Sequence, residues 1–161
     1  MMRFNLCAVF VLCATLDVHA EDWPQGSGPA GSYIAEGSAA AAWSVVHGKT
    51  IAWSKALPET GQSTVVIKDG RLFYTCYQPL EADGELGSNI VAYCADAQTG
   101  DVLWQRKIRG QYPLRLSGCF SDSTSPPAVT DGERVCFFNA SGTVTCFDMQ
   151  GDQLWLSLIH I

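Results

Sequence analysis

The stretch Ala92–Trp104, AYCADAQTGDVLW, has two apolar runs on either side of a short polar segment. This pattern is typical of two antiparallel strands joined by a tight turn. Gly100 can adopt the positive φ that such a turn requires, and the Asp96 carboxylate can accept hydrogen bonds from nearby backbone amides. Trp104 follows the turn, and its large ring is suited to packing between neighbouring sheets. We interpret the stretch as a device that builds the fold, and not as a cofactor-binding box.

The motif recurs towards the end of the chain. In VTCFDMQGDQLW, residues 144–155, the side chains Asp148, Gly151 and Trp155 repeat Asp96, Gly100 and Trp104. Asp-Gly pairs at 69–70 and 131–132 mark a second repeated hairpin. The resulting order of four short strands per unit is the signature of a propeller blade of roughly 40–50 residues. The fold class predicted here is therefore an all-β β-propeller of four-stranded antiparallel blades.

The apolar patterns predict nine strands, and no sustained helical period follows the first 20 residues. The predicted strands cover residues 50–56, 65–68, 72–77, 90–94, 102–108, 128–130, 135–139, 143–147 and 153–158. About two to three blades are present, whereas propellers close with about four to eight. The chain stops in mid-strand at LSLIHI, to which we attach no functional weight. We expect a fragment of a longer, incomplete propeller.

The first 20 residues have the features of a secretory signal. Arg3 precedes an apolar run from Phe4 to Leu16, and Val18-His19-Ala20 ends in the small residue expected before cleavage. An uncleaved anchor is the less favoured alternative. We divide the chain into a signal peptide (1–20), an N-terminal leader (21–49) and partial propeller blades (50–161). The predicted location is periplasmic or extracellular, with membrane contact only through the export signal.

Charge and cysteine content narrow the function. The net charge of −6 argues against a nucleic-acid partner, because phosphates must be neutralised by lysine and arginine. Five cysteines follow the signal: Cys76, Cys94, Cys119, Cys136 and Cys146. Their pairing is left open by the sequence. Cys136 and Cys146 flank a turn, and we favour two buried apolar side chains over a cross-strand disulfide at this place.

The motifs resemble those of the PQQ-like (pyrroloquinoline-quinone-like) β-propeller superfamily. AYCADAQTGDVLW resembles its tryptophan-docking repeat, and DGERVCFFNASGTVTCFDMQGDQLW, residues 131–155, resembles the following blade. Asp22–Pro29, DWPQGSGP, resembles the DWPQWRGP opening of an exported bacterial group, with Gly26 and Ser27 in place of tryptophan and arginine. The superfamily contains both quinoprotein dehydrogenases and non-enzymatic scaffolds. The resemblance thus implies a fold but no single activity.

No catalytic, cofactor or metal site is evident in the sequence. EADGELGSN, residues 81–89, is interpreted as an acidic insertion and not as a calcium loop, and His47 as solvated. The basic residues Arg106, Lys107, Arg109 and Arg115 are interpreted as an exposed stretch of mixed sign. Asn139-Ala140-Ser141 is a glycosylation sequon only in a host that uses it. The best candidate for a functional element is the long loop Arg109–Pro127.

These observations favour an exported binding or scaffold module whose partner is a protein or another extracellular ligand. The alternative is the N-terminal part of a PQQ-dependent alcohol or sugar dehydrogenase, for which PQQ and calcium are the expected cofactors. The sequence lacks the adjacent cysteine pair of the alcohol-dehydrogenase branch. The six repeated residues of the turn motif are assigned structural roles under both hypotheses.

Overall fold

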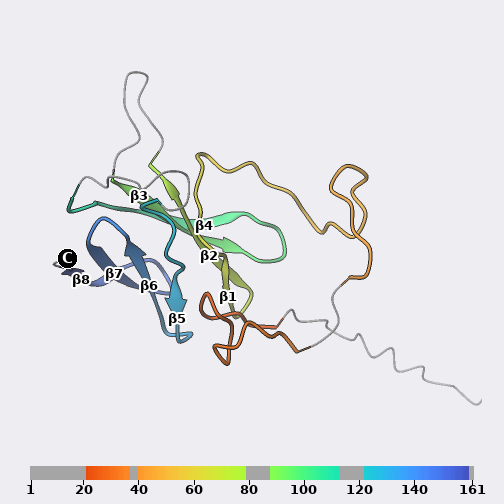
Figure 1. Cartoon of the computed structure of the whole chain (residues 1–161), viewed down its shortest axis with the longest axis horizontal. Coiled ribbons are helices and arrows are strands. Elements are labelled where there is room, and N and C mark those ends of the chain that lie inside the picture. Colours follow the sequence, from red (N-terminus) through yellow and green to blue (C-terminus); the bar gives the residue numbers. More distant parts are fainter. Residues whose placement is uncertain (1–20, 37–39, 79–87, 113–121, 160–161) are drawn as a thin grey trace, which may run out of the picture.

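A computed structural model describes residues 21–36, 40–78, 88–112 and 122–159. These residues form two four-stranded antiparallel sheets and no helix, which confirms the predicted all-β class (Figure 1). Blade 1 contains β1 (Val66–Lys68), β2 (Arg71–Tyr77), β3 (Ile90–Asp96) and β4 (Val102–Ile108). Blade 2 contains β5 (Val129–Thr130), β6 (Arg134–Asn139), β7 (Thr143–Asp148) and β8 (Gln153–Leu158). In each blade the strands are neighbours in chain order.

The two blades have the same register. Phe73 lies opposite Cys94 between β2 and β3, and Cys136 lies opposite Cys146 between β6 and β7. The fourth strand of each blade follows a bulge that lies just after these cysteines, between Cys94 and Ala95 and between Cys146 and Phe147. Corresponding positions can therefore be compared residue by residue.

The main hydrophobic core lies between the blades. Blade 1 contributes alternate residues of its strands, and blade 2 contributes the opposite set, because side chains alternate between the two faces of a strand. The buried members are Val66, Phe73, Ile90, Ala92, Cys94, Trp104, Ile108, Ala128, Val135, Phe137 and Phe147. A smaller cluster of Cys76, Val91 and Tyr93 lies on the other face of blade 1. Each blade thus depends on its neighbour to cover its apolar face.

The leader pairs with the first strand of both blades. The Trp23 amide donates to the Ile67 carbonyl at 2.8 Å, and the Ile67 amide donates back at 2.9 Å. At the next residue, the Pro24 carbonyl accepts from the Thr130 amide at 2.9 Å. Figure 1 draws this segment in red beside β1. These bonds cover backbone groups that would otherwise be free at the edges of β1 and β5.

The prediction of a strand at residues 50–56 is wrong. Thr50 has a φ of +56°, and no backbone hydrogen bond joins residues 51–56 to another described residue. A strand needs a partner to complete its ladder, and the apolar pattern alone does not supply one. The other eight predicted strands correspond to β1–β8, with ends that shift by one or two residues.

The preferred interpretation of Cys136 and Cys146 is also wrong, because these residues form a disulfide. The pairing of β6 with β7 places the two residues directly opposite each other, with their Cα atoms 4.0 Å apart. Cross-strand proximity of this kind permits a bridge. Cys76 and Cys94 are free and buried.

None of the described residues forms a helix of the length and apolar character needed to cross a membrane.

Candidate functional site

The turn of blade 1 is held by the side chain and backbone of Asp96. Its carboxylate accepts from the Gln98 amide at 2.8 Å and from the Thr99 amide at 2.9 Å. The Gly100 amide donates to the Asp96 carbonyl at 2.8 Å, and Gly100 has a φ of +74°. These bonds satisfy backbone amides that the reversal of the chain takes out of the ladder. The carboxylate is therefore engaged within its own turn.

The turn of blade 2 repeats this arrangement with one residue fewer. The Asp148 carboxylate accepts from the Gln150 amide at 2.9 Å and from the Asp152 amide at 2.8 Å. The Gly151 amide donates to the Asp148 carbonyl at 3.0 Å, with φ of +86° at the glycine. We call 96–100 and 148–151 the docking turns.

Each docking turn receives a tryptophan from the preceding unit. The Trp53 indole N–H donates to the Ala97 carbonyl at 2.9 Å, and the Trp104 indole N–H donates to the Met149 carbonyl at 3.1 Å. Ala97 and Met149 each follow the aspartate of their turn. The turn glycine lies against the ring in both cases, since an added Cβ would stand 2.6 Å from Trp53 and 2.8 Å from Trp104.

The basic residue two positions after each tryptophan contacts the docking turn itself or the residue that follows it. Arg106 donates from Nε to the Gly151 carbonyl at 2.7 Å, and Lys55 forms an ion pair with Asp101 at 2.9 Å. Arg106 also lies over the Trp104 ring, 5.8 Å from its centroid. The pairing with Lys55 holds the pKa of Asp101 below its usual value. Arg106 is thus part of the contact between the blades.

Trp155 is the third tryptophan of the series, and its ring has no docking turn among the described residues. Its side chain is 43% exposed, whereas Trp104 is only 8% exposed. It lies beside Val129 and Cys136 on the face of blade 2 that points away from blade 1. The sequence motif is the same at both positions. The difference in exposure therefore comes from the presence of a docking turn beside Trp104 and not from the tryptophan itself.

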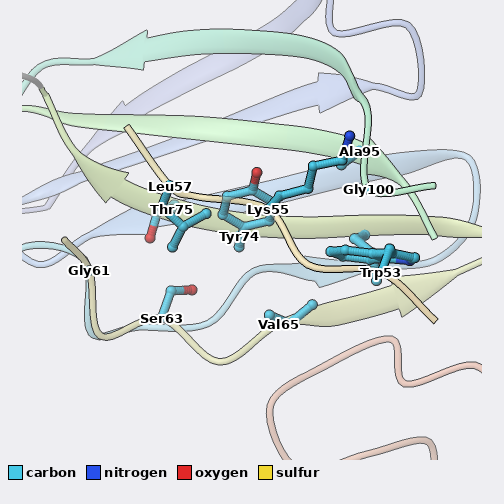
Figure 2. A pocket seen from close by; sticks show the side chains of 11 residues that line it. Trp53, Lys55, Leu57, Gly61, Ser63, Val65, Tyr74, Thr75, Ala95 and Gly100 are labelled. Carbon is cyan, nitrogen blue, oxygen red and sulfur yellow. The ribbon is translucent and has the colours of Figure 1, made fainter. Parts of the chain in front are cut away.

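A cavity of about 260 Å³ lies on the outer face of blade 1, under the segment that carries Trp53 (Figure 2). Its apolar lining includes Trp53, Leu57, Val65, Leu72, Tyr74 and Ala95. Tyr74 stacks on Tyr93 with ring centroids 5.1 Å apart, which fixes one wall. The hydroxyls of Ser63 and Thr75 are also at the wall. The Thr75 hydroxyl already donates to the Thr124 carbonyl, at 3.1 Å.

The two free thiols among the described residues, Cys76 and Cys94, are poorly suited to chemistry. Burial raises the pKa of Cys76 and of Cys94 to about 11 in each case. Because the thiolate is the nucleophile and the metal ligand, these groups are almost wholly protonated at neutral pH. They serve as small apolar side chains.

Some of the other residues singled out in the sequence lie in the described part of the chain, and others lie outside it. Residues 81–87 of the acidic insertion, Arg115, Cys119 and His160 lie outside the described residues. The sequon residue Asn139 is fully buried, and its amide donates to the carbonyl of Ser88 at 2.8 Å and to that of Ile108 at 3.3 Å. A buried amide with these bonds is not available to a glycosylating enzyme in the folded protein.

The described end of the long loop is structural. Asp122, Ser123 and Thr124 are buried, and the Asp122 carboxylate accepts from the Thr124 amide at 2.7 Å. The Thr124 hydroxyl accepts from the Gln62 amide at 2.8 Å, which ties this loop to the segment before β1. The sequence analysis did not predict this contact. The run SDSTSPP indicated only that the chain turns here.

The family model described as outer membrane protein assembly factor BamB, a model of PQQ-like repeats, matches residues 80–160, just over half of the chain. The chain belongs to this BamB-type repeat family. A solved structure, BamB from Moraxella catarrhalis, is similar at 17% identity and a TM-score of 0.30. The match covers 61% of this chain and 34% of that one. No curated protein matches.

The two blades are accordingly part of a β-propeller of the BamB-type family. The PQQ-like repeats raise the question of a bound quinone, for which PQQ and calcium are the expected cofactors of the dehydrogenase alternative. Among the described residues, no group of three or more His, Cys, Asp or Glu side chains is placed to hold a metal ion. The docking-turn carboxylates are bonded within their own turns. The disulfide joins Cys136 and Cys146 on neighbouring strands, so it is not the pair of adjacent cysteines that the alcohol-dehydrogenase branch has.

Proposed function

We propose that this chain is an exported binding or scaffold module of the BamB type, and that it acts through contact with another protein. The single observation that carries the proposal is an apolar segment exposed outside the blades. Trp43 is 68% exposed and Val46 is 89% exposed, with Val45 exposed beside them. Solvent-exposed apolar groups gathered in one short segment are typical of protein contact sites.

The segment has a defined shape. Ser44 and Lys49 form a pair of backbone hydrogen bonds, each 3.0 Å long, that closes a tight hairpin around residues 45–48. Figure 1 draws it in orange, well away from the two sheets. A closed hairpin presents its side chains with less loss of conformational freedom on binding than an open loop.

Two further features support the proposal. The Cys136–Cys146 disulfide is favoured in an oxidising compartment, as expected for a periplasmic or extracellular protein with a signal at residues 1–20. The polar groups of both docking turns are consumed in local hydrogen bonds, which leaves little for catalysis there. The dehydrogenase alternative has less support, and membership of the DWPQWRGP group stays a prediction.

A photo-crosslinking amino acid at position 46 tests the proposal in cells that export the protein. We expect a discrete protein adduct with the probe at position 46 and none with the probe at Gln98, which is also exposed but lies on a docking turn. A Trp43→Ala change should weaken the adduct. Equal adducts at both positions, or none, would contradict the proposal. Dye reduction with alcohols or aldoses after addition of PQQ and calcium would instead favour the dehydrogenase.

A further inference from the structure

β8 is the last strand of blade 2, and only one of its two edges has a backbone partner in the described part of the chain. β7 pairs with it over five residue pairs, from Thr143–Leu158 to Phe147–Gln153. On the other edge, no described residue forms a backbone hydrogen bond with residues 153–158. A free edge of this kind presents a row of N–H and C=O groups with which another strand can pair.

The side chains of this strand are unusually apolar for an edge. All six residues of β8 are exposed, and Leu154, Leu156 and Leu158 are 53%, 48% and 47% exposed. Leu156 and Leu158 lie opposite Thr145 and Thr143 of β7, which places them on one face of the blade. Leu154 shares that face, because side chains alternate along a strand. We call these three residues the leucine stripe.

The same edge is protected by charge in blade 1. β4 and β8 begin with the same motif, DVLWQRKI in blade 1 and DQLWLSLI in blade 2. The positions of β8 that hold Leu156–Leu158 are occupied in β4 by Gln105, Arg106 and Lys107. Cations on an edge strand, lysine above all, discourage pairing with a second sheet. Blade 2 has lost this protection at an otherwise equivalent strand.

The chemistry of β8 favours a second copy of this chain as its partner. Residues 153–158 contain no charged side chain, although the chain has a net charge of −6. Two copies can therefore bring these strands together without placing like charges opposite each other. In an antiparallel pair centred on Leu156, that residue faces itself, and Leu154 faces Leu158 of the second copy. Each stripe thus meets an apolar stripe in the matching register.

We propose that the free edge of β8 is a self-association site, at which β8 of a second copy pairs antiparallel around a two-fold axis that passes through Leu156. The two four-stranded sheets then form one continuous sheet, and the leucine stripes of the two copies cover each other. Six residues from each copy give a small contact, so the dimer is reversible and depends on concentration.

This contact leaves the two faces of blade 2 unobstructed. Trp155 lies opposite Cys146, and Ser157 lies opposite Val144, so both point to the face that bears the disulfide. The leucine stripe lies on the opposite face, and the new backbone hydrogen bonds form at the edge. Self-association through the edge is therefore distinct from any contact made through the Trp155 face.

Sedimentation velocity of the whole chain, from low to high micromolar concentration, tests the proposal. The parent should shift reversibly from monomer to dimer. Leu156→Lys and Leu156→Glu should each weaken association by about tenfold or more, because like charges then lie directly opposite each other. A mixture of the two variants should form a dimer again, since lysine faces glutamate across the axis. Leu156 is half-exposed, so both variants should keep the unfolding midpoint of the parent.

Two control variants locate the contact on the strand. Gln105→Lys alters the same position in β4 and should leave association unchanged. Ser157→Lys adds a charge to the Trp155 face and should change it by less than about threefold, because that side chain can extend into water. The proposal is overturned if the parent stays monomeric, or if the mixture of Leu156→Lys and Leu156→Glu does not associate. It is also overturned if Ser157→Lys abolishes association while Leu156→Lys does not, which would place the contact on the Trp155 face.

Discussion

The same pair of positions is built differently in the two blades. In blade 1, Phe73 and Cys94 lie opposite each other and are buried against blade 2. In blade 2 the same positions hold Cys136 and Cys146, which are joined covalently and lie beside the half-exposed Trp155. One pair is stabilised by packing against a neighbour, and the other by a bond that needs no neighbour. A common backbone register therefore supports two different ways of holding strands together.

Removing the tryptophan that joins the blades should give the largest effect. Trp104→Ala takes a buried ring from between Phe73, Phe137 and Phe147, and it should lower the free energy of unfolding by about 3–5 kcal/mol. Trp155→Ala is the matched control, with an expected cost of about 1 kcal/mol because its ring is already 43% exposed. Urea unfolding measures both. Equal costs would mean that docking does not hold the blades together.

Reduction of the disulfide should have the next largest effect. The bridge closes a loop with a sequence separation of 10, and its loss should lower the free energy of unfolding by about 2–3 kcal/mol. Urea unfolding with and without a reductant measures the change. A Cys136→Ser, Cys146→Ser variant should show no further response to reductant, whereas a Cys94→Ser variant should respond as the parent does. A parent chain that is indifferent to reductant would contradict the role given to the bridge.

Glycine substitutions should sharpen the comparison at the docking turn. Gly151→Ala and Gly70→Ala both place a side chain at positive φ, +86° and +72°, at a cost of about 1 kcal/mol each. Only Gly151→Ala also meets a ring, since its Cβ would stand 2.8 Å from Trp104. We expect it to cost about 1 kcal/mol more than Gly70→Ala in thermal or urea unfolding. Identical costs would show that the glycine is needed for its backbone alone.

The smallest effect should come from the ion pair that fixes the leader. Lys68 donates to Asp22 at 2.7 Å and holds the pKa of that carboxyl below its usual value. A lowered folded-state pKa gives stability that is present above the unfolded pKa and is lost as the pH falls through the folded value. Stability should therefore decline below about pH 4, and less steeply in Asp22→Asn. Unfolding between pH 2 and 6 measures the difference, which should stay below about 1 kcal/mol because the pair is partly exposed.

Much of the fold could be predicted from residues that act locally. Asp96 and Gly100 define their turn through their own hydrogen bonds and φ, so the sequence indicates the hairpin without its surroundings. The alternation in β6 likewise follows from burial on one face, whereas β2 and β3 are apolar because both of their faces are largely buried. The strand at 50–56 failed for the opposite reason. Its pattern is that of a strand, but its ladder depends on a partner that the local sequence does not contain.

The candidate site was less predictable because it depends on register. The disulfide requires Cys136 and Cys146 to face each other, and the sequence leaves the turn length between them open to several registers. The cavity arises from Val65, Tyr74 and the distant Trp53, whose contact is set by the docking turn. The exposed hairpin at 44–49 could have been suspected from the apolar residues Trp43, Val45 and Val46. A search for catalytic residues does not consider such residues.

Exchange of the indole N–H protons, observed by NMR, tests the docking of the tryptophans most directly. The Trp104 proton is bonded to the Met149 carbonyl and its ring is almost fully buried, whereas no described acceptor holds that of Trp155. We predict that the Trp104 proton exchanges at least tenfold more slowly than that of Trp155, with Trp53 in between. Equal, fast exchange at Trp104 and Trp155 would contradict the account, because the blades would then not be joined through a docked tryptophan.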